Sequence, residues 1–193
     1  DPFVVTLNAN SGADAVSAVM ANIRFWVAGD APSTATRTVE AVLTDGDGGT
    51  SLTATKQITV TAINDAPTIT NLSGDSLAYS EGAGAVVIEQ GGNAVVADVD
   101  SSNFDTGTLA VSFTAGSDSA EDVLSIRNQG TGAGQIGVAG SNVSYAGATI
   151  GTFAGGSAGV NLVITLNASA TPTAVTALVQ NIIYQNTDMD APT

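Results

Sequence analysis

An internal repeat is the feature that most constrains how this chain can fold. Residues 3–25 (FVVTLNANSGADAVSAVMANIRF) align without a gap with residues 162–184 (LVITLNASATPTAVTALVQNIIY), and a looser match joins residues 31–33 to residues 191–193. One repeat is therefore about 160 residues long, and self-similarity at a fixed period is typical of tandem architectures. The chain of 193 residues contains one period and a duplicated flank.

The repeat predicts that the chain begins inside one repeat and ends inside the next. We expect residues 1–66 to be the C-terminal part of one domain, and residues 67–193 to be the N-terminal and middle part of the following domain. Neither part should bury its whole core alone, because the strands that complete it lie elsewhere. Either neighbouring copies complete each half, as in strand-complemented fibres, or the chain is an excerpt of a longer array.

Most of the sequence shows the alternation of apolar and polar residues that is typical of β-strands. Clusters of Gly, Asn, Asp and Ser separate the runs, a pattern that predicts an all-β fold built as a β-sandwich. The Gly-rich stretch 130–159 is expected to form short strands and turns with shallow packing and less order. The predicted strands are residues 3–7, 37–44, 53–63, 77–80, 85–88, 94–98, 108–114, 123–127, 143–145 and 160–166.

One segment of each repeat copy departs from the strand pattern. Behind Thr171 as a cap and Pro172 in the first turn, apolar residues recur at helical spacing through residue 184. We interpret this stripe as a short core helix that closes one end of the sandwich. It consists of Val175, Leu178, Val179, Ile182 and Ile183, and its counterpart in the first copy of Val16, Val19, Met20 and Ile23.

Charge and composition exclude several classes of function. The chain has 18 acidic and 4 basic residues and a formal net charge of −14, so nucleic acid and anionic membranes are poor partners. No apolar run approaches the roughly 20 residues of a membrane span, and no signal segment opens the chain, so we expect no direct membrane insertion. Cysteine and histidine are absent, which excludes thiolate and imidazole chemistry. Since nothing places paired carboxylates in a cleft, we expect no enzyme.

Acidic and amide residues gather at strand ends. The alternate spacing of Asp98 and Asp100 puts both carboxylates on the same side of an extended segment, where they repel each other unless a cation lies between them. Because histidine and cysteine are missing, any metal ion must be held by oxygen. The candidate ligands are Asp45 and Asp47 in TDGDGG, Asn64 and Asp65 in IND, Glu81 in YSEGAG, and Asp98, Asp100 and Asn103 in ADVDSSNFD.

Two explanations remain open for Asp45 and Asp47. They can serve as metal ligands, or they can form the hairpin turn between residues 37–44 and 53–63, since Asp caps turns and Gly supplies positive φ.

The junction between repeats could supply a calcium site. Ca²⁺ takes about six to eight oxygen ligands in irregular geometry, whereas Mg²⁺ requires strict octahedral coordination. Asn64 and Asp65 would come from the linker, and Asp98, Asp100 and Asn103 from the following domain. Binding would replace carboxylate repulsion by attraction and stiffen the hinge.

The motifs VEAVLTDGDGG, TKQITVTAINDAPTI, YSEGAG, VVADVDSSN and TALVQNIIYQNT resemble the cadherin-like "NDAP" repeats of very large bacterial surface adhesins of the RTX type. The resemblance covers nearly the whole chain except its Gly-rich centre. It implies an Ig/cadherin-like β-sandwich tandem repeat with one short helix per repeat. It also implies a secreted protein at the bacterial cell surface, where such arrays are stalks in adhesion and biofilms.

The resemblance also implies roles for the acidic residues. Cadherins bind calcium between domains with an Asp-x-Asn-Asp-Asn linker, a first-strand Glu and an Asp-x-Asp pair. Ala62 and Ala66 stand where the outer Asp and Asn of that linker would be, so we expect about one or two calcium ions per junction. The implied ligands are Asn64 and Asp65 in the linker, Glu81 in the first strand, the pair Asp98 and Asp100, and Asp45 in the late hairpin.

We therefore expect a structural extender whose partners are neighbouring repeats or copies of the same chain. The alternative is a carbohydrate- or peptide-binding adhesin module, in which aromatic side chains stack on a host or surface ligand. Phe25 and Tyr184 occupy the same repeat position, which favours core packing for both. Trp26 is the candidate surface contact, because Gln185 holds the matching position in the other copy.

Overall fold

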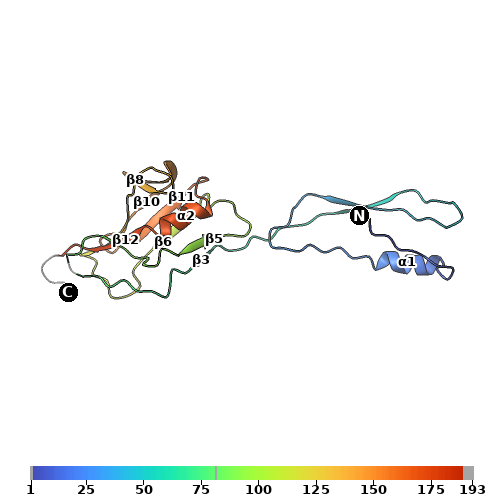
Figure 1. Cartoon of the computed structure of the whole chain (residues 1–193), viewed down its shortest axis with the longest axis horizontal. Helices are drawn as coiled ribbons and strands as arrows, with labels where there is room; N and C mark the ends of the chain where they lie inside the picture. Colours follow the sequence, from blue (N-terminus) through green and yellow to red (C-terminus); the bar gives the residue numbers. More distant parts are fainter. Residues whose placement is uncertain (1, 81, 189–193) are drawn as a thin grey trace. The chain divides into compact units, whose positions relative to one another are not determined.

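The computed structural model describes residues 2–80 and 82–188, and it divides into two compact units (Figure 1). The first unit is Asp1–Ile63 and the second is Asn64–Thr193. Both consist mainly of antiparallel β-structure with one short helix each, so the fold is all-β as the sequence predicts. Over the described residues, neither helix has the length and hydropathy needed to cross a membrane.

The first unit holds one helix and one hairpin. Helix α1 spans Ala13–Ala21 and buries none of its residues. Strands β1 (Arg37–Ala41) and β2 (Ala54–Ile58) pair antiparallel, and an isolated bridge between Thr44 and Thr50 closes the connecting turn. No described residue of this unit is buried, so the unit has no hydrophobic core of its own.

The second unit contains three antiparallel sheets (Figure 1). The largest has the order β6-β11-β10-β9-β8, the second the order β4-β12-β7, and the third pairs β3 with β5. The strands are β3 (Thr68–Thr70), β4 (Val86–Val87), β5 (Val95–Ala97), β6 (Thr108–Val111), β7 (Asp122–Ile126), β8 (Ile136–Ala139), β9 (Asn142–Tyr145), β10 (Ala148–Ala154), β11 (Leu162–Leu166) and β12 (Ile182–Asn186).

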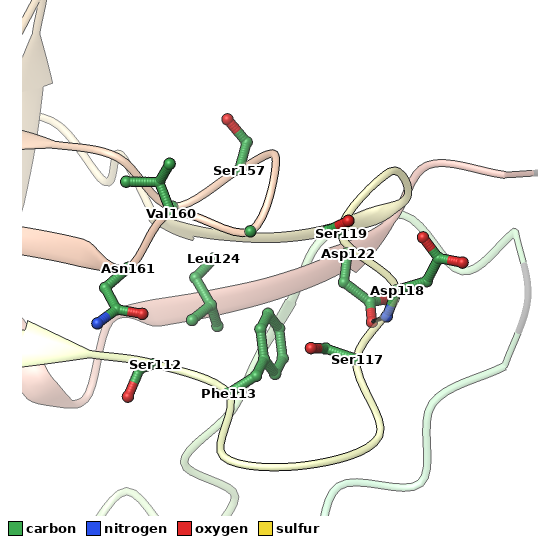
Figure 2. A pocket seen from close by; sticks show the side chains of 12 residues that line it. Ser112, Phe113, Ser117, Asp118, Ser119, Asp122, Leu124, Ser157, Val160 and Asn161 are labelled. Atoms are coloured by element: carbon green, nitrogen blue, oxygen red, sulfur yellow. Dashed lines mark hydrogen bonds between the residues drawn. The ribbon is translucent and has the colours of Figure 1, made fainter.

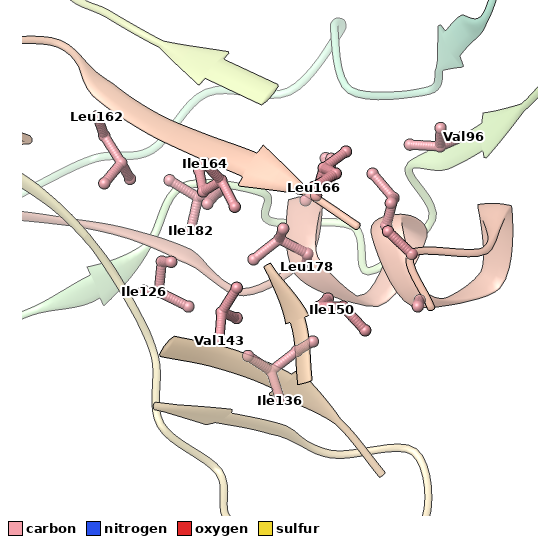
Figure 3. Close-up of a cluster of buried hydrophobic side chains, with 14 of the residues drawn as sticks. Val96, Ile126, Ile136, Val143, Ile150, Leu162, Ile164, Leu166, Leu178 and Ile182 are labelled. Atoms are coloured by element: carbon pink, nitrogen blue, oxygen red, sulfur yellow. The ribbon is translucent and has the colours of Figure 1, made fainter. Parts of the chain in front are cut away.

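A single hydrophobic core lies in the second unit, between these strands and helix α2 (Pro172–Val179) (Figure 3). Its fully buried side chains include Ile136, Val143 and Ile150, which all come from the Gly-rich stretch 130–159. The expectation of shallow packing there is wrong, because the glycines turn the chain between three paired strands whose apolar residues point into the core. The other large, fully buried side chains are Leu162, Ile164, Leu178 and Ile182.

Helix α2 begins as its sequence predicts and ends earlier. The Thr171 side chain accepts a hydrogen bond from the Ala174 amide at 3.3 Å, and Pro172 occupies the first turn. The helix buries Ala174, Val175, Leu178 and Val179. Ile182 and Ile183 do not continue it but open β12, which pairs with β7 and β4.

The two repeat copies share local structure and differ in strand formation. Asn181 donates from Nδ2 to the Ala177 carbonyl at 2.7 Å, and its counterpart Asn22 donates to the Ala18 carbonyl at 2.8 Å. Residues 3–7, however, form no strand, although the matching β11 pairs with both β10 and β6. The predicted strand at 3–7 is wrong in the first unit, since a strand forms only beside a partner that completes its backbone hydrogen bonds.

Strand prediction also failed at residues 77–80, which are irregular, and it missed β3. The short strands expected in the Gly-rich stretch are present as β8, β9 and β10. The other predicted runs contain strands, mostly shorter than expected.

Candidate functional site

The acidic residues at the start of the second unit come together because of strand register. Strands β3 and β5 are antiparallel with Thr68 opposite Ala97, so the residues just before β3 lie beside those just after β5. The Asp65 amide accordingly donates to Asp100 Oδ2 at 2.9 Å, across a separation of 35 residues. This hydrogen bond connects the segment that enters the unit to the loop that follows β5.

Asp98 organises that loop. Its Oδ1 accepts hydrogen bonds from the amides of Asp100 at 3.1 Å and Ser101 at 2.9 Å. Desolvation alone would raise the pKa of Asp98, but the hydrogen bonds from Asp100 and Ser101 outweigh it and hold the pKa below its ordinary value. Asp98 is therefore a carboxylate at neutral pH.

The two predicted asparagine ligands make hydrogen bonds inside their own turns. Asn64 donates from Nδ2 to the Asp65 carbonyl at 2.8 Å, and Asn103 Oδ1 accepts from the Asp105 amide at 3.1 Å. The structure thus joins the Asp65 backbone to the pair Asp98 and Asp100, and it uses Asn103 to cap the next turn of the loop.

Asp45 and Asp47 lie in the β1–β2 turn of the first unit. Asp45 Oδ1 accepts from the Asp47 amide at 3.0 Å and from the Gly49 amide at 2.9 Å. Gly46 and Gly48 both have positive φ, so the hairpin turn accounts for this sequence by itself. Glu81, the predicted first-strand ligand, lies outside the described residues.

The donor chemistry of the second-unit loop suits calcium, but its protein ligands do not complete a site. Asp98 and Asp100 each give one carboxylate oxygen to backbone amides. The other oxygen of Asp100 accepts a long hydrogen bond of 3.5 Å from the Ser101 hydroxyl, which a cation would have to share or displace. Among residues 2–80 and 82–188, no group of three or more Asp, Glu, His or Cys side chains is arranged to hold a metal ion. Since Ca²⁺ takes about six to eight oxygens, carbonyl groups and water would have to supply the remainder.

A polar notch of about 50 Å³ was not predicted from the sequence. Figure 2 shows the side chains that line it, with Ser117 and Ser119 near Asp118 and Asp122, and Ser112 and Ser157 farther from these two acids. Its acids have structural partners, because Asp122 accepts from the Tyr184 hydroxyl at 2.6 Å and from the Asp118 amide at 2.8 Å. The three acids of SDSAED, just before a predicted strand, are the signal that could have revealed it.

Tyr184 connects this notch to a larger apolar groove. Burial, followed by the hydrogen bond to Asp122 and its charge, raises the pKa of Tyr184 to about 12. The same ring contacts Tyr79 and Phe113 edge to face, with centroids 4.7 Å and 5.9 Å away. The groove has a volume of about 300 Å³ and is lined mainly by Leu77, Tyr79, Ile88, Val111, Phe113, Leu124 and Tyr184.

The exposure of Trp26 does not single it out as a ligand contact. Its side chain is 79% exposed, but Phe3 of the same unit is equally exposed. Apolar side chains are exposed throughout the first unit, so the exposure of Trp26 does not distinguish it from its neighbours.

Comparison with protein-family models, with curated proteins and with solved structures finds no match to this chain. The fold places it in the all-β class, and its function has to be inferred from its own residues.

Proposed function

We propose that this chain is a structural extender, a stalk segment of a tandem-repeat protein at a bacterial cell surface. Its repeats would be Ig/cadherin-like β-sandwiches, each with one short helix. The proposal requires no catalysis, and neighbouring repeats or further copies of the chain would be its partners.

The difference in burial between the two repeat copies carries this proposal. Each large, fully buried side chain of the second copy has an apolar but exposed counterpart in the first, as the three pairs below show. Exposing these apolar side chains is costly, at about 25 cal/mol for each Å² of apolar surface left in water. The exposed fractions are 0% for Leu162 and 79% for Phe3, 0% for Leu178 and 38% for Val19, and 1% for Ile182 and 48% for Ile23.

The same sequence pattern therefore packs into a hydrophobic core in the second unit but not in the first. In the proposed array, a segment of an adjacent repeat that resembles residues 64–161 would cover the apolar residues of the first copy. Folding units that are completed by their neighbours form long continuous assemblies and therefore suit a mechanical role.

Calcium would stiffen the start of each unit. The Asp65 amide is hydrogen-bonded to the loop that carries Asp98 and Asp100, and these two carboxylates belong to residues only two positions apart. A cation shared by Asp98 and Asp100 would relieve their repulsion and fix the segment that enters β3. Asn64 adjoins Asp65, and Asn103 lies three residues after Asp100, so each could add an amide oxygen if its side chain turned toward the cation; Asn103 Oδ1 would then give up its hydrogen bond from the Asp105 amide.

Thermal unfolding with calcium and with a chelator tests the metal-dependent part. Calcium at about 100 times its Kd should stabilise the second unit by about 2.7 kcal/mol. Asp98→Asn should abolish this gain, because asparagine keeps an oxygen for the turn amides but removes the charge. The exposed residue Asp75 provides the control, and Asp75→Asn should keep the full calcium effect. An unfolding temperature that is the same in calcium and chelator would remove calcium from the proposal.

A further inference from the structure

We propose that strand β6 and the apolar groove beside it bind an extended, basic peptide segment of a partner protein by β-strand addition. The segment would pair with the unpaired edge of β6 and place alternate apolar side chains over the groove. A Lys or Arg side chain of the segment would point to the acidic notch. The inference concerns the second unit alone and does not depend on the stalk proposal.

Strand β6 has unpaired backbone groups along one edge. In an antiparallel pair, alternate residues turn their N–H and C=O groups toward the partner strand, and the residues between them turn these groups away. The Leu166 amide donates to the Gly107 carbonyl at 2.8 Å, so alternate residues from Gly107 to Val111 bond β11. The backbone groups of Thr108 and Ala110 therefore point away from β11, and both residues are exposed. Among residues 2–80 and 82–188, no other strand pairs with β6.

Two other edge strands of the second unit are closed by polar side chains. In β8, Asn128 accepts from the Val138 amide through Oδ1 and donates to the Val138 carbonyl through Nδ2, each at 3.2 Å. In β5, Thr176 Oγ1 accepts from the Val96 amide at 2.9 Å and donates to the Val96 carbonyl at 3.3 Å. Covered edges of this kind cannot pair with another chain.

The remaining edge strands are short or are bonded to a loop. Strands β3 and β4 have three and two residues, and Leu124 in β7 donates its amide to the Gly156 carbonyl at 2.7 Å. Strand β6 has four residues, and the segment TLAVSF that begins with it has no charge or proline to protect it. An open edge of this kind is the surface that strand addition uses.

The apolar groove lies at the end of β6. Val111 and Phe113 line it, and alternate residues of a strand point to the same side, so an added strand would place its own alternate side chains next to theirs. Two rings of the groove are fixed in place. The Tyr79 hydroxyl donates to a backbone carbonyl at 3.0 Å, and the Tyr184 hydroxyl to a carboxylate at 2.6 Å. Binding would therefore cost these rings little conformational freedom.

Charge selects a basic segment. Ser112 lines both the groove and the polar notch, so Asp118 and Asp122 of the notch are near the end of β6, with Glu121 between them in the chain (Figure 2). Of the chain's 4 basic residues Arg127 alone belongs to the second unit, which holds most of the 18 acidic residues. A second copy of the chain fits poorly, because acidic residues outnumber basic ones in both units. Opposite charge on the partner guides its orientation and speeds association.

A synthetic peptide, Arg-Val-Thr-Val-Thr-Val with both ends blocked, tests the charge preference. Titration of the full chain should show binding that weakens as salt is added, because salt screens exposed charges. Replacing the Arg of the peptide by Glu should weaken binding about tenfold. Equal binding of the two peptides would overturn the charge argument, and no binding of the Arg peptide at millimolar concentration would overturn the docking site.

Two N-methylated versions of this peptide test strand addition. One version carries methyl groups on one alternate set of amides, and the second version carries them on the other set. Only one set can face β6, so one version should lose binding and the other should retain it. Equal binding of the two versions would show that the peptide does not add as a strand.

Hydrogen exchange locates the peptide on β6. In the free chain the amides of Thr108 and Ala110 should exchange faster than those of Leu109 and Val111, which bond β11. The Arg peptide at about 100 times its Kd should slow exchange at Thr108 and Ala110 about 100-fold. Unchanged exchange there would overturn the site. Slow exchange at these two amides in the free chain would show that the chain covers this edge itself, and it would overturn the proposal as well.

Asp118→Asn tests the position of the basic side chain. Asparagine keeps an oxygen for the Ala120 amide, which donates to Asp118 Oδ1 at 2.8 Å, but it removes the charge. The variant should bind the Arg peptide several-fold more weakly, whereas the exposed control Asp30→Asn should bind it like wild type, with thermal unfolding as the check that both fold. Equal affinity in the two variants would overturn the contact with the notch. The calcium-dependent melt uses no peptide, so the stalk proposal and this inference can fail separately.

Discussion

Single residues show how far local chemistry alone determines this structure. Asn167 Oδ1 accepts from the Ser169 amide at 2.8 Å, and its counterpart Asn8 Oδ1 accepts from the Asn10 amide at 2.9 Å. These turns form in both copies because donor and acceptor lie within the same short segment. Burial of the neighbouring apolar residues differs between the copies because it depends on groups far away in the sequence.

Tyr184 should make the second unit sensitive to alkaline pH. Its pKa is about 12 in the folded state against an ordinary value of 10.0, so between these values the unfolded chain releases the phenol proton first. The unfolded state then binds fewer protons, and stability must fall as pH rises from 10 towards 12. Tyr184→Phe should reduce this fall while costing about 1 kcal/mol at neutral pH through the lost hydrogen bond to Asp122.

Chemical denaturation at several pH values measures this effect, with Tyr145→Phe in β9 as the control. Equal alkaline slopes for Tyr184→Phe and wild type would show that ionisation of Tyr184 is not the cause.

Gly156 should tolerate alanine poorly. Its φ of 92° is left-handed, and an added Cβ would collide with the Leu124 carbonyl of β7. Gly134 has a φ of 76° with open space around it, so Gly134→Ala bears the conformational cost alone, about 1–2 kcal/mol. Gly156→Ala should lower the free energy of unfolding by clearly more, as measured by denaturant titration of both variants. Similar losses would mean that the backbone near Leu124 moves freely.

At the scale of elements, the sequence predicted the features that depend on residues close to one another along the chain. The start of α2 followed from Thr171 and Pro172, and most strands from their alternation. The end of α2 could not be predicted, because Ile182 and Ile183 suit a helical stripe but gain more from pairing in β12. Likewise the alternation in residues 3–7 could not reveal that the first unit offers no partner strand.

The two helices provide a matched pair of variants. Leu178 of α2 is fully buried and Val19, its counterpart in α1, is 38% exposed. Leu178→Ala should lower the stability of the second unit by about 2–5 kcal/mol. Val19→Ala should change stability by about 0.5 kcal/mol or less in the dilute chain, as exposed substitutions do. Denaturant titrations of dilute protein measure both, and a large loss for Val19→Ala would show that α1 is packed.

At the scale of the whole molecule, the repeat predicted two parts, and the contacts divide the chain at residues 63 and 64. The candidate metal site was predictable in part. The spacing of Asp98 and Asp100 indicated a carboxylate pair, but the hydrogen bond from the Asp65 amide depends on the register of β3 against β5. The groove was not predictable, since Leu77, Val111 and Tyr184 meet there from distant segments.

Hydrogen exchange of the full chain should show two levels of protection. Amides of β10, β11, β12 and α2 surround the core and should exchange through opening of the entire second unit. Amides of α1 should exchange much faster in dilute solution, because that helix buries no residue and short helices are marginal without packing. Strong protection of α1 in dilute protein would show that this helix is packed. It would contradict the proposal that the apolar residues of the first unit need an adjacent repeat to cover them.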